Sequence, residues 1–185
     1  MKKIMFNDKY GLTNAVLSGY KTVTRRIMNR QPDPDDIAYM EPKDYPCQPT
    51  YKVGEIVAVA QSYDQIDPQI VHCRIDDLGD WGGDHPGQYN KMFVRADLMP
   101  HQIRITSVRP ERLQNITDED CLKEGLEWQH GANMFYVNYN HTNNSRELLG
   151  DTPREAFASL IDKISGRGTW ERNPYVWRIE FELVK

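Results

Sequence analysis

The sequence predicts an α+β protein with a small antiparallel β-barrel or a curled antiparallel sheet at its centre and helices at its flanks. Several short segments have the composition or the alternation of strands, and two or three have the periodicity and caps of helices. Strands and helices do not alternate regularly, and no internal repeat is visible. The 185 residues fit one domain that spans 1–185.

The first elements are a short apolar opening, a helix and a strand. Lys3–Phe6 is apolar, and Leu12, Ala15 and Val16 then have helical spacing. Gly19 follows where a C-terminal glycine ends a helix. Residues 21–26 therefore leave a helix end and run into a strand.

The middle of the chain predicts three strands and a short helix. Residues 51–61 contain a glycine turn followed by a β-branched run, and residues 91–96 and 102–113 are two further strand candidates. Thr117 is a good N-cap, and Gly125 lies where the helix that it begins should end.

The C-terminal quarter predicts the clearest helix and the clearest strand. Thr152 and Glu155 form a capping box with Pro153 at the first helical position. The apolar stripe of this helix consists of Phe157, Leu160, Ile161 and Ile164. Residues 175–184 alternate apolar and charged side chains, which is typical of a half-buried antiparallel strand.

Three long insertions near 31–49, 76–90 and 129–150 separate these elements. The first contains five prolines, the second is rich in Asp and Gly, and the third is rich in Asn and Tyr without clear periodicity. We therefore expect surface excursions rather than regular elements at all three.

Charge patterning points to a binding site in residues 21–30. This segment carries four basic side chains and no carboxylate, although the whole chain has a formal charge of −4. A local cationic spot on an acidic background favours a site for an anionic ligand, a nucleotide or RNA.

The same composition argues against several other classes of protein. The N-terminus has no apolar run long enough for a signal peptide or a membrane span, so we expect a cytoplasmic protein that does not bind membranes. Three widely spaced cysteines predict neither disulfides nor a zinc site. His72 beside Cys73 lacks spaced partners, so no metal and no cofactor is expected.

Four segments resemble a known family when they are taken in order. They are GYKTVTRR (19–26), YKVGEIVAV (51–59), IRITSVRPERLQNITDEDCLKEG (103–125) and NPYVWRIEFELV (173–184). Together they resemble the ASCH domain of the PUA-like superfamily, and most closely its phage-associated branch. The resemblance implies a small β-barrel with flanking helices and a cleft that binds RNA, nucleotides or modified nucleosides.

The resemblance also implies site residues. The family signature Gly-x-Lys-x-x-(Glu or Thr)-x-Arg falls on Gly19, Lys21, Thr24 and Arg26. The threonine form resembles a bacterial ASCH enzyme that removes the acetyl group from acetylated cytidine, in which a threonine, a lysine and a glutamate act together. The matching catalytic residues here are Lys21, Thr24 and Glu124.

The remaining residues of the segment are predicted to bind the ligand. They are Gly19, Thr22, Arg25 and Arg26. Arg25 departs from the pattern, because the enzyme has an apolar residue at the corresponding position.

The protonation state of Lys21 separates catalysis from binding. A threonine hydroxyl attacks an amide carbonyl only if a nearby base takes its proton. With an ordinary pKa near 10.4, only about one lysine in 2,500 is neutral at pH 7. Burial and neighbouring cations such as Arg25 and Arg26 would have to lower that pKa, whereas a protonated lysine would bind phosphate.

Several alternatives remain open at this stage. Lys21 and Arg26 could be ordinary cations, Thr24 a strand residue and Glu124 a solvated helix end. The cleft could instead be a non-catalytic RNA-binding module, for which four phosphate contacts predict a log-log salt slope of about −3. A ribonuclease is disfavoured because the segment has no histidine as general base, and a structural or partner-binding role of the insertions also remains.

Overall fold

Two β-sheets and the helices between them make up the fold. The structure is a computed structural model that describes residues 1–33, 39–41, 44–66, 87, 89–140 and 145–184. In these ranges the strands are β1 Lys3–Ile4, β2 Val23–Ile27, β3 Ile56–Val59, β4 Gln102–Arg112, β5 Glu127–Gln129, β6 Met134–Asn140, β7 Ser145–Gly150 and β8 Tyr175–Leu183. The helices described there are α1 Leu12–Leu17, α3 Asp118–Lys123, α4 Pro153–Ser165 and α5 Thr169–Arg172.

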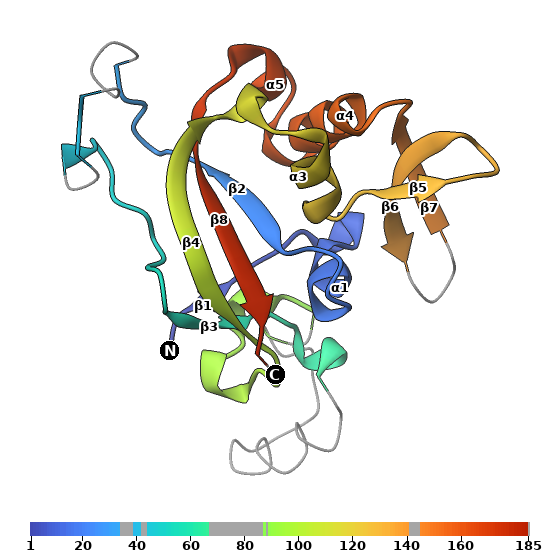
Figure 1. Cartoon of the computed structure of the whole chain (residues 1–185). Helices are drawn as coiled ribbons and strands as arrows, with labels where there is room; N and C mark the ends of the chain where they lie inside the picture. The colour runs from blue at the N-terminus through green and yellow to red at the C-terminus, as the bar shows by residue number, and fades with distance from the viewer. Residues whose placement is uncertain (34–38, 42–43, 67–86, 88, 141–144, 185) are drawn as a thin grey trace.

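The larger sheet has the strand order β1-β3-β4-β8-β2. Neighbouring strands are antiparallel except β1 and β3, which are parallel. The register between β4 and β8 shifts between Ile105 and Ser107, and such an irregularity bends a strand. Figure 1 shows the resulting curvature of β4 around β8. Within the described residues the sheet does not close, so the curled sheet is confirmed and the barrel is not.

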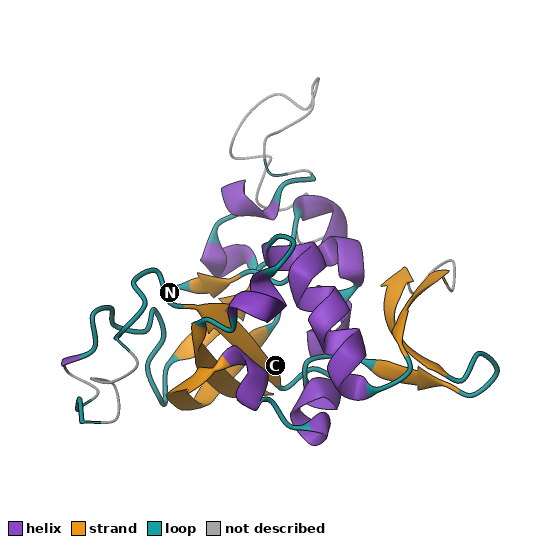
Figure 2. Ribbon diagram, turned by 90° about the horizontal axis from the view of Figure 1, so that it is seen from above, coloured by secondary structure: helices purple, strands orange, loops and turns teal. Residues whose placement is uncertain are grey.

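The helices lie between the two sheets, as the view from above shows (Figure 2). The α4 capping box forms as predicted, and Thr152 Oγ1 accepts a hydrogen bond from the Glu155 amide. The main core joins both sheets through α4, whose Phe157 and Leu160 are each 2% exposed. The predicted strands at 51–61 and 102–113 and the helix capped by Thr117 are confirmed as β3, β4 and α3.

The strand predicted at residues 91–96 is wrong. The chain there makes two 3-10 turns, Lys91–Phe93 and Ala96–Leu98. The carbonyls of residues 91, 92 and 94 converge on Lys3 Nζ. This convergence curls the backbone, so these carbonyls do not form a strand ladder.

The insertions differ from one another. Residues 129–150 were expected to lack regular structure, but they contain most of the second sheet, β5-β6-β7. Tyr136 and Val137 of β6 are buried, which explains why strict alternation is absent from the sequence. The described part of 31–49 contains no α-helix or strand, as predicted, and most of 76–90 lies outside the described residues.

The last strand is more buried than its alternation predicts. We expected the charged residues of 175–184 to face solvent, yet Arg178 is only 5% exposed. It hydrogen-bonds Asp120 of α3, which covers this face of the sheet. Among the described residues, no helix has the length and apolarity needed to cross a membrane.

Candidate functional site: a cleft beside a buried ion-pair cluster

A cleft of about 580 Å³ lies against β2. Its walls are the N-terminal segment around Phe6, the loop at Cys47–Tyr51, the apolar face of α4 and the end of α3 at Glu124. Pockets for small organic ligands typically measure about 300 to 1,000 Å³. The cleft therefore has the size of a small-molecule site.

Lys21 is the most deeply buried basic residue of the cleft, with 2% exposure. It follows Gly19, whose positive φ of 78° turns the chain out of α1. Lys21 Nζ donates to the carbonyl oxygens of Val23 at 2.8 Å and Glu124 at 2.9 Å, and also to Glu124 Oε2. These three acceptors match the three donors of an ammonium group.

The end of α3 approaches Lys21 closely because Gly125 follows Glu124. Gly125 has a φ of 100°, and a Cβ at this position would lie 3.3 Å from Ala15 Cβ and 3.6 Å from Lys21 Cβ. A larger residue would be strained at this φ and would crowd α1. This glycine therefore helps to place Glu124 against Lys21.

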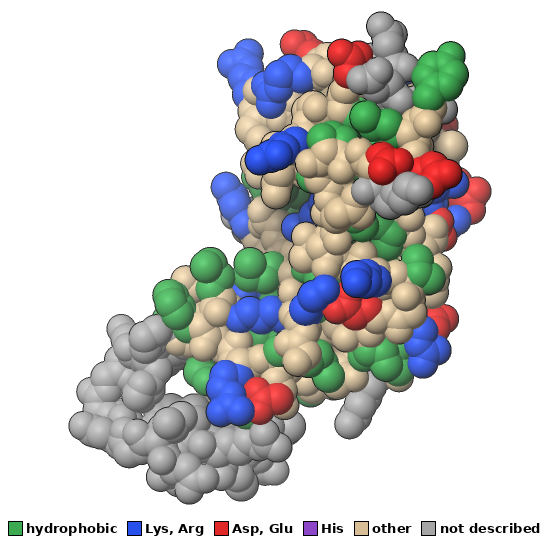
Figure 3. All heavy atoms as spheres, turned by 90° about the vertical axis from the view of Figure 1, so that its left-hand side faces the viewer, with side chains coloured by type: hydrophobic (Ala, Val, Ile, Leu, Met, Phe, Trp, Pro, Cys, Tyr) green, Lys and Arg blue, Asp and Glu red, His purple; other side chains and the backbone are tan. Residues whose placement is uncertain are grey.

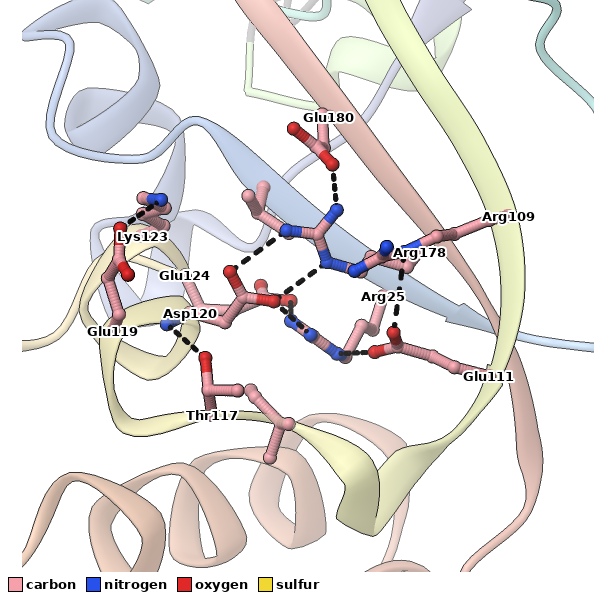
Figure 4. Close-up of polar contacts among 12 residues, drawn as sticks. Arg25, Arg109, Glu111, Thr117, Glu119, Asp120, Lys123, Glu124, Arg178 and Glu180 are labelled. Carbon is pink, nitrogen blue, oxygen red and sulfur yellow. Dashed lines mark hydrogen bonds and ion pairs between the residues drawn. The ribbon is translucent and has the colours of Figure 1, made fainter.

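Arg25 connects Glu124 to further carboxylates. Its guanidinium donates through Nη1 to Glu124 Oε1 at 3.2 Å, through Nη2 to Asp120 Oδ2 at 2.7 Å, and through Nε to Glu111 Oε1 at 2.7 Å. Asp120 also accepts from Arg178 Nε at 2.7 Å and Nη2 at 2.9 Å. Figure 4 shows Asp120 between the two guanidinium groups. We call the set the buried ion-pair cluster, and it consists of Lys21, Arg25, Glu111, Asp120, Glu124 and Arg178.

Strand pairing places three arginines beside one another. Arg25 is opposite Arg178, and Arg178 is opposite Arg109. Like charges directly opposite are unfavourable in a sheet. Asp120 and Glu124 compensate Arg25 and Arg178, because their four-residue spacing puts both carboxylates on the same face of α3.

The charges of the cluster shift the pKa values of its members. Hydrogen bonds from Arg178 and then Arg25 hold the pKa of Asp120 well below its usual range. Burial lowers the pKa of the Lys21 amine, and the nearby Glu124 carboxylate opposes that shift. Burial also raises the pKa of the Cys121 thiol to about 12, so this cysteine is a core residue.

Thr24 and Arg26 line the cleft without joining the cluster. Thr24 is 6% exposed. Within the described part of the chain, no hydrogen bond joins its hydroxyl to Lys21 or Glu124. Arg26 donates through Nη2 to the Met5 carbonyl, and its guanidinium carbon lies 5.8 Å from the centre of the Phe6 ring. Its Nε is buried and has no hydrogen-bond partner among the described residues.

The structure brings five of the predicted site residues together at the cleft: Lys21, Thr24, Arg25, Arg26 and Glu124. Gly19 and Thr22 do not line it, and the ligand-binding role predicted for them stays a prediction. Glu124 is not a solvated helix end, because it is 5% exposed.

Sequence reasoning missed Glu111, Asp120 and Arg178. The spacing of Asp120 and Glu124 on one helix was a usable signal, but the alternation of β8 suggested that Arg178 faces solvent. No group of at least three His, Cys, Asp or Glu residues in the described ranges is arranged to hold a metal ion.

The surface does not show a continuous basic groove on the face in Figure 3. Lys and Arg side chains form separate spots there, with apolar and neutral atoms between them. A strand of nucleic acid is usually bound along a positively charged groove that follows its backbone. This face of the described structure does not have that pattern.

Comparison with known proteins gives one structural match. No family model and no curated protein sequence matches the chain. The chain is similar to the high-resolution crystal structure of an ASCH domain from Lactobacillus crispatus JV V101, with 12% sequence identity and a TM-score of 0.39. The match covers 97% of this chain and 76% of that chain. The matched structure is described as an ASCH domain, which is the family that the motifs resemble.

Proposed function

We propose that this chain is an amidohydrolase that removes an acyl group from the amide of a modified pyrimidine nucleoside, such as acetylated cytidine. The observation that supports the proposal best is that Lys21, Thr24 and Glu124 line one small cleft, with the Lys21 amine bonded to the Glu124 carboxylate. A hydroxyl, an amine and a carboxyl group can serve as the nucleophile, the base and the acid of an acyl transfer.

The first half of the reaction forms an acyl-enzyme. Thr24 Oγ1 attacks the acyl carbonyl carbon, and the neutral Lys21 amine takes the hydroxyl proton. The carbon-nitrogen bond then breaks, and protonated Glu124 gives its proton to the departing amine of the base. The products of this half are the free nucleoside, an ester on Thr24, an ammonium at Lys21 and a carboxylate at Glu124.

The second half restores the enzyme. Water attacks the ester carbonyl and gives a proton to the Glu124 carboxylate, while the Thr24 oxygen leaves and takes a proton from Lys21. The acid is released, and the pair is again a neutral amine and a neutral carboxyl group. The first half moves one proton onto Lys21 and one off Glu124, and the second half reverses both transfers. No outside acid is needed.

Burial supports a proton that moves between Lys21 and Glu124. A low-dielectric site disfavours both charges, so the neutral pair lies closer in free energy to the ion pair than it would in water. Burial indeed lowers the pKa of Lys21.

The charge balance of the site favours a nucleoside over an RNA strand. Lys21 and Arg25 are paired with carboxylates, so they are not available to bind phosphates. Among the described cleft residues, Arg26 is a cation without a carboxylate partner. One such cation fits a single polar or anionic group of a small ligand.

Turnover of acetylated cytidine tests the proposal, with Thr24→Ser as the matched control for Thr24→Ala. Purified protein is incubated with the nucleoside, and the deacetylated product is quantified by chromatography. Thr24→Ala should reduce kcat by about 1,000-fold or more. Thr24→Ser, which keeps a hydroxyl at the same position, should retain much of the wild-type kcat. The proposal fails if the wild-type protein does not turn over or if Thr24→Ala is as active as wild type.

A further inference from the structure

We propose that Arg25 is a positioning residue that orients the Glu124 carboxylate toward Lys21. This inference rests on the proposed function, because it assigns a role within the same site. It concerns a residue whose guanidinium contacts Glu111, Asp120 and Glu124 and takes no part in the proposed proton transfers.

The two oxygens of Glu124 have different partners. Oε2 accepts from Lys21 Nζ, and Oε1 accepts from Arg25 Nη1 at 3.2 Å. Among the described residues, Arg25 is the donor to Oε1. Fixing one oxygen sets the plane of the carboxylate and leaves the other directed at the amine.

Arg25 is itself held rigidly. Its side chain is 1% exposed, Nε is bound by Glu111 of β4, and Nη2 is bound by Asp120 of α3. All three nitrogens of the guanidinium thus contact carboxylates from two different elements. A planar guanidinium held in this way fixes the position of Glu124 relative to the sheet and the helix.

Arg25 also acts on the Lys21–Glu124 pair through its charge. The ionisable groups around the pair are Lys21, Arg25 and Arg26 next to or on β2, Tyr51 of the loop, Asp120, Cys121 and Glu124 of α3, Glu111 of β4 and Arg178 of β8. Removal of Arg25 takes a cation away from Lys21 and a hydrogen bond away from Glu124. Loss of the cation makes protonation of Lys21 more favourable, so the Lys21 ammonium becomes harder to deprotonate.

Arg178 provides a matched control for Arg25. It is buried in the same cluster and opposite Arg25 in the sheet, and it binds Asp120 and Glu180 rather than Glu124. Arg178→Met therefore removes a comparable buried guanidinium without removing a partner of Glu124. If either methionine variant does not fold, Arg25→Gln and Arg178→Gln make the same comparison with a polar side chain.

Two measurements are made on each folded variant. The first is kcat and KM for acetylated cytidine. The second is the titration of Lys21 by NMR in protein labelled at the lysine Cε, with the signal assigned by Lys21→Arg. The titration does not depend on turnover, so it tests the role of Arg25 even if acetylated cytidine is not a substrate.

The Arg25 variant should lower kcat by about 100-fold with KM within about twofold of wild type, as expected when a catalytic group is misplaced. Its Lys21 midpoint should move upward, whereas the Arg178 variant should keep kcat and the midpoint close to wild type. An unchanged Lys21 midpoint in the Arg25 variant, or an equal shift in both variants, would overturn the positioning role. Absence of turnover in wild type would count against the proposed reaction alone.

Discussion

Arg25 and Arg26 are neighbours on β2, yet their environments are opposite. Arg25 contacts three carboxylates in the buried ion-pair cluster. Arg26 bonds one backbone carbonyl, stacks near Phe6 and keeps a buried Nε without a partner in the described chain. The carboxylates around Arg25 balance its charge, whereas no carboxylate of the described chain pairs with Arg26.

This difference shows why a count of basic residues overstates the positive charge of the site. The cluster contains three cations, Lys21, Arg25 and Arg178, and three carboxylates, Glu111, Asp120 and Glu124. Only one of these carboxylates was associated with the site from the sequence. The fold therefore pairs two of the four cations of residues 21–30, Lys21 and Arg25, with carboxylates, and four changes of residue or condition test this comparison.

Removal of Asp120 should have the largest effect on stability. Asp120→Ala leaves Arg25 and Arg178 without the carboxylate between them, and breaking a buried pair in this way costs about 3 to 5 kcal/mol. The free energy of unfolding is measured by urea denaturation. Glu119→Ala is the control, because Glu119 forms an exposed ion pair with Lys123 on the same helix and should cost about 0.5 kcal/mol or less. Equal losses in the two variants would contradict a structural role of the cluster.

Acid should remove part of the same stabilisation. Arg178 and Arg25 hold the pKa of Asp120 below the unfolded value of about 3.9, so its contribution is present above that pH and is lost as the pH falls below it. Unfolding free energies measured from pH 6 down to pH 3 should decrease more steeply for wild type than for Asp120→Asn. Parallel pH profiles would show that Asp120 ionisation is not linked to folding.

Replacement of Arg26 should affect binding more than folding. Arg26→Met removes a hydrogen bond to Met5 together with an unsatisfied buried Nε, so stability should change by about 1 kcal/mol or less. Affinity for acetylated cytidine, measured by calorimetry in a Thr24→Ala background, should fall by about tenfold to 100-fold, the value of a hydrogen bond to a charged donor. A destabilisation as large as that of Asp120→Ala would remove the distinction between the two arginines.

Salt should have the smallest effect. If Arg26 is the cation that meets a phosphate, the affinity for a single-stranded RNA oligonucleotide should have a log-log salt slope of about −0.7, well short of −3. Fluorescence anisotropy across a range of salt concentrations measures this slope. A slope near −3 would mean that Lys21 and Arg25 leave their carboxylates to bind RNA.

Much of the fold follows from local signals in the sequence. The capping box at Thr152, the cap at Thr117 and the glycine after α1 act within a few residues, so they could be predicted. The sheet β5-β6-β7 could not be predicted, because β6 and β7 pack against α4 as well as against each other. The strand prediction for residues 91–96 was wrong for a related reason. The carbonyl groups of this segment bind Lys3, which lies far away in the sequence.

The candidate site also contains residues that local sequence signals predict and residues that they do not. Lys21, Thr24 and Arg26 belong to one motif, and Glu124 could be matched by its place after a strand and a cap. The partners of Arg25 come from β4 and α3, and whether a charged residue is buried depends on what covers it. No local pattern indicates that α3 packs over Arg178, so the cluster became visible only in the folded chain.

The alignment of Arg25, Arg178 and Arg109 across three strands has a consequence for the order of folding. When β2, β8 and β4 pair before α3 is in place, Glu111 and Glu180 are beside these guanidinium groups, but Asp120 and Glu124 are still missing and the repulsion is only partly compensated. We expect the docking of α3 and the completion of this part of the sheet to occur in the same kinetic step. Mutations in α3 should then slow refolding rather than only accelerate unfolding.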